Sequence, residues 1–183
     1  MFYGKKDQDC LCWPVAGQCL LPRTGQAWCR DAAGNATACA GTGQDGELRS
    51  GTPWPTPRFA PAPQGREAVL DRVTGLVWAG SADAGPGATT WEEALAVAAR
   101  YQGGGWRLPN INELESLVDA GRAAPALPAG HPFAAVGEVY WSATTSAFDP
   151  AWAHALYLHK GAVGVGVKAG RDFLVWPVAG PLS

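Results

Sequence analysis

The chain has 183 residues, which is enough for one domain with a substantial apolar core. Its formal net charge of −2 gives no overall positive field for nucleic acid or an anionic membrane. No apolar run reaches the roughly 20 residues that span a bilayer, so the sequence predicts neither a nucleic-acid partner nor a membrane span. Nine Trp, 24 Gly and 15 Pro indicate a loop-rich protein with large apolar side chains for a core or a binding surface.

Residues 1–22 are interpreted as an N-terminal arm, followed by a domain over residues 23–183. The pentapeptide Trp-Pro-Val-Ala-Gly occurs at residues 13–17 and again at residues 176–180. The arm is then the remnant of a preceding copy of the domain, a segment folded back on its own domain, or a strand that docks on the sheet edge of a neighbouring subunit. The candidate assembly residues are Trp13, Pro14, Val15, Trp176, Pro177 and Val178.

The five cysteines all lie in the first 39 residues. This distribution is typical of a segment that buries little and is stabilised by disulfides, which favours an extracellular or cell-surface location. Cys29 and Cys39 flank a short turn and are expected to pair. Cys19 would then pair with Cys10 or Cys12, which leaves one thiol free or bonded to another chain. Zinc is the alternative, but Cys10 and Cys12 are too close in sequence for the usual ligand spacing, so no metal site is predicted.

Two Gly-rich turns follow the arm, at residues 24–26 and 42–47. Asp45 and Glu47 carry oxygen atoms that calcium prefers, but their spacing does not match an EF-hand loop and hairpin turns use the same residue types. No cofactor is therefore predicted, with calcium near Asp45 and Glu47 as the alternative. Residues 53–64 are expected to form an extended Pro-rich connector.

A strand–turn–strand hairpin is predicted over residues 69–78, followed by two helices. The first helix begins at Thr90 with Glu93 three residues later, the signature of a capping box. The second begins after Asn110, with Glu113 at the reciprocal position. Strands are then predicted at residues 139–143, 153–159, 161–168 and 173–178. Helices placed between two strand-rich regions indicate an α+β fold.

Five short motifs occur in a fixed order along the chain: Leu21–Gln26, Gly41–Gly46, Thr74–Trp78, Trp106–Asn110 and Tyr140–Ser142. Together they resemble the Lcl C-terminal domain family, found in bacterial surface and adhesin proteins. The resemblance implies a C-type-lectin-like fold, with two short helices packed on antiparallel sheets, and here a disulfide-stapled N-terminal arm in addition. This fold is distantly related to that of formylglycine-generating enzymes.

The resemblance implies a binding module rather than an enzyme. Formylglycine-generating enzymes use a cysteine pair in their C-terminal half, whereas no cysteine follows Cys39, and no Gly-x-Ser-x-Gly elbow is present. The expected role is a surface adhesin or ligand-display protein for a glycan or a protein. Its ligand is expected in the C-terminal half, where the candidates are Thr144, Thr145, Asp149, Trp152, His154, Tyr157, His159, Lys160, Lys168 and Arg171.

The alternative function is the repeating subunit of an extracellular filament, joined head to tail through the arm. The run Gly161–Val167 alternates small and β-branched residues, so it could pack flat against another chain. An ordinary two-stranded hairpin is the simpler interpretation of the same run.

Overall fold

The computed structural model describes residues 21–62 and 67–180, which form two compact units that meet between Trp54 and Pro55. The predicted boundary between residues 22 and 23 falls at the very start of the described chain and stays a prediction. The candidates of the arm lie outside the described residues: Cys10, Cys12, Trp13, Pro14, Val15 and Cys19.

The first unit is built around a small hairpin, in which β1 (Cys29–Arg30) pairs antiparallel with β2 (Ala36–Thr37). The Asp31 carboxylate holds the turn by accepting the backbone N–H groups of Ala33 and Asn35. The turn brings Cys29 and Cys39 together, and the predicted disulfide between them is confirmed, with a Cα–Cα distance of 5.2 Å. A disulfide suits a unit that buries little apolar area.

The Gly-rich stretch after Cys39 contains a short helix, α1 (Asp45–Leu48), where a turn was predicted. The helix starts because the backbone N–H groups of Glu47 and Leu48 both reach the carbonyl of Gln44. The ends of the unit are joined by backbone hydrogen bonds from Arg23 N–H to the Thr52 carbonyl and from Thr52 N–H to the Leu21 carbonyl.

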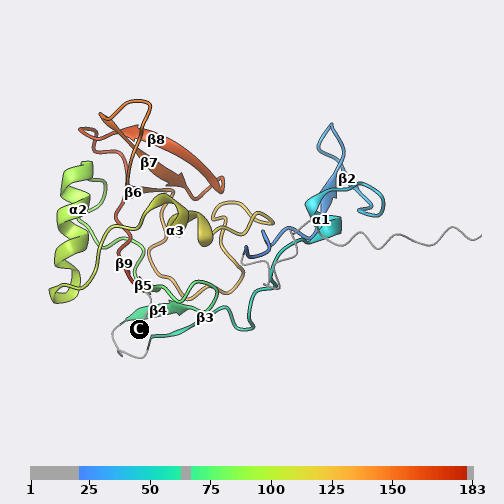
Figure 1. The fold of residues 1–183 in the computed structure, drawn as a ribbon, viewed down its shortest axis with the longest axis horizontal. Coiled ribbons are helices and arrows are strands. Elements are labelled where there is room, and N and C mark those ends of the chain that lie inside the picture. The colour runs from blue at the N-terminus through green and yellow to red at the C-terminus, as the bar shows by residue number, and fades with distance from the viewer. Residues whose placement is uncertain (1–20, 63–66, 181–183) are drawn as a thin grey trace, which may run out of the picture. The chain divides into compact units, whose positions relative to one another are not determined.

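In the described part of the second unit there are two antiparallel sheets and two α-helices, which confirms the predicted α+β class (Figure 1). Its C-type-lectin-like form stays a prediction. The first sheet has the order β3-β4-β5-β9 and the second the order β6-β7-β8. The elements are β3 (Phe59–Pro61), β4 (Ala68–Asp71), β5 (Val77–Ala79), α2 (Trp91–Arg100), the 3-10 helix η1 (Tyr101–Gly103), α3 (Ile111–Ser116), β6 (Val139–Thr145), β7 (Trp152–Tyr157), β8 (Ala162–Val167) and β9 (Val178–Ala179).

Both helices begin at the predicted caps. The Thr90 hydroxyl accepts the N–H of Glu93, and the Glu93 carboxylate accepts the N–H of Thr90. Asn110 and Glu113 make the same reciprocal pair at the start of α3. Each capping box satisfies two N–H groups that a helix start would otherwise leave without a partner. This explains why the residue pattern alone was sufficient to predict both helix starts.

The main core lies where both sheets meet α3, which Figure 1 shows between β6–β8 and β3–β5. Leu114 and Leu117 enter it from the chain around α3, and Trp78 and Tyr140 enter it from the two sheets. Trp176 lies among them with no exposed surface, its ring centroid 5.5 Å from that of Trp78. A second cluster packs α2 against the β6–β7–β8 sheet.

The C-terminal segment differs from its prediction as one strand over residues 173–178: only Val178–Ala179 is strand. The reason is that the segment passes from one sheet to the other. Leu174 exchanges backbone hydrogen bonds with Val139 and Trp141 of β6, whereas Val178 pairs with Trp78 of β5. We call residues 168–180 the closing segment, because it links the edges of both sheets.

The predicted Pro-rich connector also differs in part, since residues 59–61 form β3 and pair antiparallel with β4. Pro61 is tolerated because β3 is an edge strand of the described sheet. None of the helices among the described residues is long and apolar enough to span a membrane.

Candidate functional site

The predicted ligand-binding residues lie on the second sheet and its loops, but they divide between the two ends of β7. At one end the Tyr157 ring lies across Gly164, and its hydroxyl donates to the Val165 carbonyl at 3.3 Å. The His159 ring is 6.2 Å from that of Tyr157, and Lys160 Nζ lies 5.7 Å from the Tyr157 ring centroid. This end of the sheet therefore carries aromatic and cationic side chains that lie around Tyr157.

At the other end of the sheet, Lys168 extends over the start of α2. Its Nζ lies 4.1 Å from the centroid of the Trp91 ring and donates to the Thr145 hydroxyl at 2.8 Å. The Trp91 indole N–H donates to the Ser142 carbonyl, which fixes the ring beneath the ammonium group. Trp91 is not among the predicted binding residues, because nothing local in the sequence relates it to Lys168.

Arg171 forms an ion pair with Glu93, which is also the capping residue of α2. The N–H of Thr90 lowers the pKa of the Glu93 carboxyl, burial opposes this, and Arg171 lowers it further. Lys168 and Arg171, predicted as cations for a ligand, thus both have partners within the protein. Their present contacts stabilise the junction between α2 and the sheet.

The remaining predicted residues shape this same end. Asp149 accepts the N–H of Ala151 with its side chain and the N–H of Trp152 with its carbonyl, while Ser146 N–H donates to the Trp152 carbonyl. The β6–β7 loop is therefore fixed by its own hydrogen bonds. Farther back on β6, the Thr144 hydroxyl accepts the N–H of Ile111 at the start of α3.

Phe148 stands at the tip of this fixed loop with 99% of its surface exposed. Phe148 is not among the predicted binding residues, although it is a large apolar residue between Ala147 and the turn-forming pair Asp149-Pro150. An exposed aromatic ring on an ordered loop is more informative than a single exposed aliphatic side chain, because its removal from water would stabilise a complex.

The β7–β8 hairpin presents further apolar surface on one of its faces. Val163, Val165 and Val167 alternate along β8 and are 39%, 36% and 42% exposed. Val167 is paired with half-buried Trp152, and Val165 with His154, so these side chains share a face. On the described chain β8 has a neighbouring strand on one side only. We call Phe148, Trp152, Val163, Val165 and Val167 the hairpin surface.

The opposite face of the hairpin is closed. Ala153, Ala155 and Gly166 are buried beneath α2, and a side chain at Gly166 would meet the rings of Phe173 and Trp141. The alternation of small and β-branched residues in β8 therefore has a packing cause: the glycines face aromatic rings, and the partly exposed valines lie on the other face, where Val163 is opposite the buried Leu156. The predicted hairpin is confirmed.

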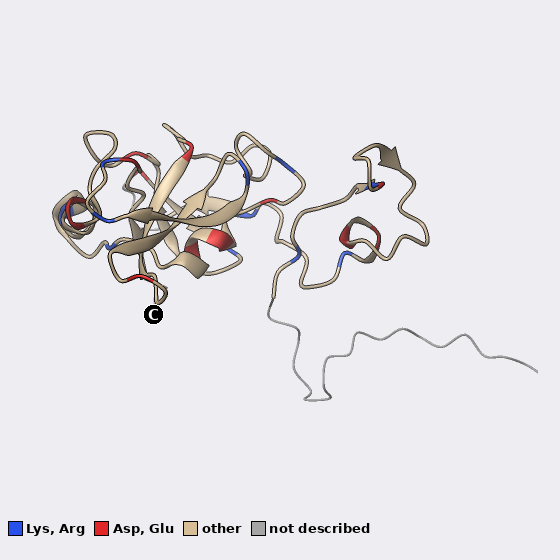
Figure 2. Ribbon diagram, turned by 90° about the horizontal axis from the view of Figure 1, so that it is seen from above, with Lys and Arg blue, Asp and Glu red and all other residues tan. Residues whose placement is uncertain are grey.

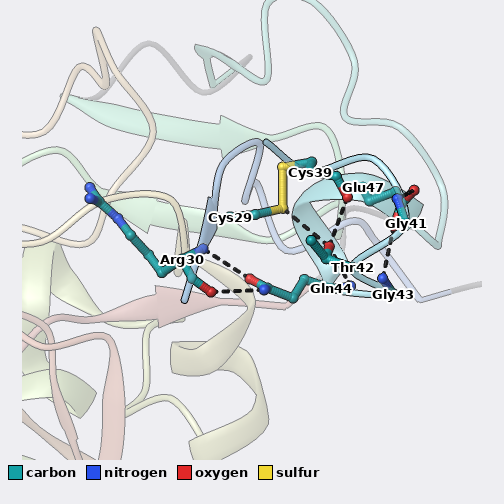
Figure 3. The surroundings of a disulfide bond; sticks show 8 residues. All are labelled: Cys29, Arg30, Cys39, Gly41, Thr42, Gly43, Gln44 and Glu47. Carbon is teal, nitrogen blue, oxygen red and sulfur yellow. Dashed lines mark hydrogen bonds between the residues drawn. A yellow bond between two sulfur atoms is a disulfide. The ribbon is translucent and has the colours of Figure 1, made fainter. Parts of the chain in front are cut away.

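In the first unit, the carboxylate of Glu47 serves as an anchor for the Gly-rich loop (Figure 3). Its two oxygens accept the N–H groups of Gly41 at 2.6 Å and Gly43 at 2.8 Å, and these bonds lower the pKa of Glu47. Asp45 accepts the hydroxyl of Thr24. Within residues 21–62 and 67–180, no three His, Cys, Asp or Glu side chains are grouped as metal ligands would be, and calcium here stays an untested alternative.

The C-terminal assembly candidates Trp176, Pro177 and Val178 are all buried in the second unit. The Trp176 indole N–H donates to the Ala79 carbonyl at 3.0 Å, and the Ala79 N–H donates to the Pro177 carbonyl. These residues hold their own domain together and offer no exposed side chain for docking.

An open pocket of about 450 Å³ lies against β3 and β4. Its walls are mostly apolar, and Glu67 and Ser81 contribute polar groups. Charged residues of both signs are interspersed along the described ribbon in Figure 2.

Comparison with known proteins identifies a family for the second unit. The sequence model of the Lcl C-terminal domain matches residues 67–179, which is more than half of the chain. No curated protein and no solved structure matches the chain. The matched range begins beside β4 and ends with β9, and so contains both helices, the second sheet and the hairpin surface. The chain therefore belongs to the Lcl C-terminal domain family.

Proposed function

We propose that the protein is a non-catalytic, extracellular binding module that recognises a protein ligand through the hairpin surface. The observation that carries the proposal is Phe148, which is almost fully exposed on a loop held by its own hydrogen bonds. Because the loop backbone is already held, binding would cost little backbone freedom, and burial of the ring would contribute to affinity.

The valines support a protein rather than a glycan as the main ligand. Val163, Val165 and Val167 offer branched apolar groups with few polar partners, and such surfaces are buried well by another protein. Sugars are recognised mainly by aromatic planes together with hydrogen-bonding groups. Here Trp152 is half-buried and the nearby Thr145 hydroxyl is bonded to Lys168.

The role as a surface adhesin or ligand-display protein follows from the same proposal. The Cys29–Cys39 disulfide supports an oxidising, extracellular location. A rigid two-sheet framework that carries an exposed loop and hairpin is suited to display a recognition surface. The alternative function is the repeating subunit of a filament, and the contacts of the closing segment support it.

The proposal is tested by probing parallel arrays of extracellular matrix proteins and of glycans with the purified protein. The matched variant is Phe148→Ser with Val165→Thr, which removes apolar surface at a fully exposed and at a partly exposed position. We expect selective binding to one or more arrayed proteins and at least a tenfold loss in the variant. Equal binding by the two proteins would refute the hairpin surface as the site, and binding to glycans alone would refute a protein ligand.

A further inference from the structure

The pentapeptide repeat is part of a longer internal match at a constant offset. Residues 5–17 align with residues 168–180 without a gap, and eight of the thirteen positions are identical. The identities are Lys5 with Lys168, Asp9 with Asp172, Leu11 with Leu174, and the five residues of Trp-Pro-Val-Ala-Gly at 13–17 and 176–180. The arm thus repeats the sequence of the closing segment.

Several of the identical positions of the closing segment help to hold the second unit together. Trp176 packs against Phe133 and Tyr140 with ring centroids 4.8 Å and 5.1 Å away, and its indole N–H donates to Ala79. Val178 exchanges two backbone hydrogen bonds of 2.9 Å with Arg107 and is paired with Trp78 on its other side. We call the place that the closing segment occupies in the second unit the slot. The contacts there depend on the side chains of the closing segment.

The positions that differ keep the pattern of buried and exposed residues. Phe173 and Val175 are buried, and their counterparts in the arm are Cys10 and Cys12, which are small apolar side chains when reduced. Arg171 is exposed, and its counterpart is the polar residue Gln8. At these positions residues 5–17 therefore keep the apolar or polar character of the closing segment, although Cys10 has a smaller side chain than Phe173.

We propose that residues 5–17 are a second closing segment, which inserts into the slot of another copy of this chain and displaces residues 168–180 there. Insertion into any slot, including the one in the arm's own domain, requires displacement of the closing segment there; insertion into a second copy is the case that would link chains. Each such contact is head to tail, so repeated insertion would join copies into an open chain.

Competition between the two segments sets the condition for assembly. The covalently linked segment has the advantage of a high effective concentration, on the order of millimolar for a short connection. Exchange between intact copies is therefore expected only at high local protein concentration. Any change that weakens the closing segment, but leaves the arm intact, should shift the balance toward insertion from a neighbour.

The test uses the full chain and two matched substitutions, studied under reducing conditions by analytical ultracentrifugation over a range of concentrations. Trp176→Ala weakens the closing segment, so insertion of an arm from another copy should become easier. We expect the dimer dissociation constant of this variant to be at least tenfold lower than that of the original protein. Adding Trp13→Ala should abolish this association. Monomers at every concentration for Trp176→Ala, or equal association with and without Trp13→Ala, would overturn the proposal.

A second measurement leaves the closing segment intact. A Cβ at Gly85 would lie 3.7 Å from a methyl carbon of Val175, whose counterpart in the arm is Cys12. In a Gly85→Cys variant, inserted arms should form a disulfide between residue 85 of one copy and Cys12 of another, which mixed ¹⁴N and ¹⁵N chains reveal by mass spectrometry. Cys12→Ser is the control. Absence of this crosslink at high concentration, or its formation within single chains only, would contradict the proposal.

Discussion

Arg58 and Asp71 form a buried ion pair that joins the start of β3 to the turn after β4, with Nη2 2.9 Å from Oδ2. The Asp71 carboxylate also accepts the N–H of Val73 and the hydroxyl of Thr74. Arg58 donates in addition to the Ser116 carbonyl at the end of α3. The pair therefore ties one sheet, its tight turn and a helix together at a single point.

We expect Asp71→Asn to destabilise the second unit by about 3–5 kcal/mol, because it leaves the Arg58 charge buried without its counter-charge. Urea unfolding followed by Trp fluorescence measures the change in the free energy of unfolding. Asp172→Asn, which removes an exposed carboxylate of the same unit, is the control and should change it by less than about 0.5 kcal/mol. Similar changes in the free energy of unfolding for the two substitutions would show that the buried ion pair stabilises the protein no more than an exposed carboxylate does.

The sequence predicted the parts of the fold that depend on neighbours along the chain. Thr90 with Glu93 and Asn110 with Glu113 lie three residues apart, so their caps could be predicted directly. Arg58 lies in a Pro-rich stretch and finds its partner thirteen residues away, across a strand pair. No local pattern distinguishes such an arginine from an exposed one, so both β3 and the ion pair were missed.

Loss of the disulfide should affect the first unit alone. Replacing both Cys29 and Cys39 by Ser opens a loop with a sequence separation of 10, and we expect about 3 kcal/mol of stability to be lost from that unit. Limited proteolysis with mass spectrometry should then show rapid cleavage within residues 21–54, with residues 67–180 still protected. Cleavage of both regions at the same new rate would contradict independent units.

Stability at acid pH should depend on Glu113. Burial raises the pKa of its carboxyl, but hydrogen bonds from Arg107 and the Asn110 N–H outweigh burial and bring the pKa below the ordinary value of 4.5. A lowered pKa in the folded state contributes stability above about pH 4.5, which is lost as the pH falls through the folded-state pKa.

We therefore expect the difference in unfolding free energy between the original protein and Glu113→Gln to be largest near neutral pH and to shrink between pH 5 and about pH 3. Urea titrations at several pH values measure it. Glu115→Gln, an exposed position on the same helix, is the control. A difference that grows as the pH falls would have the wrong sign for this ion pair.

Lys168 should contribute to stability rather than to ligand binding. Its contacts with the Trp91 ring and the Thr145 hydroxyl suggest a loss of about 0.5–1 kcal/mol for Lys168→Ala, and a change in Trp fluorescence as the ring becomes exposed. The affinity of Lys168→Ala for the ligand selected on the arrays should stay within about twofold of that of the original protein. The same result is expected for Lys160→Ala. A tenfold loss of affinity for Lys168→Ala alone would place the ligand at the start of α2.

The predicted site residues lie in the same half of the domain as the proposed hairpin surface, but several of them are engaged within the protein. Thr144, Asp149 and Lys168 have hydrogen-bonding groups that suit a ligand, yet each is bonded within the protein. Phe148 was missed because hydrophobic residues in a sequence are expected to be buried. Only the folded loop distinguishes it from the buried Phe173.

The most direct test of the proposed function is hydrogen exchange of the protein alone and in complex with a ligand from the arrays. The hairpin surface predicts slower exchange at residues 146–152 and 162–168, and unchanged exchange in α2, whose contacts lie on the opposite face of the sheet. Protection confined to α2 or to residues 21–54, with residues 146–168 unaffected, would contradict the hairpin surface as the place where this protein binds.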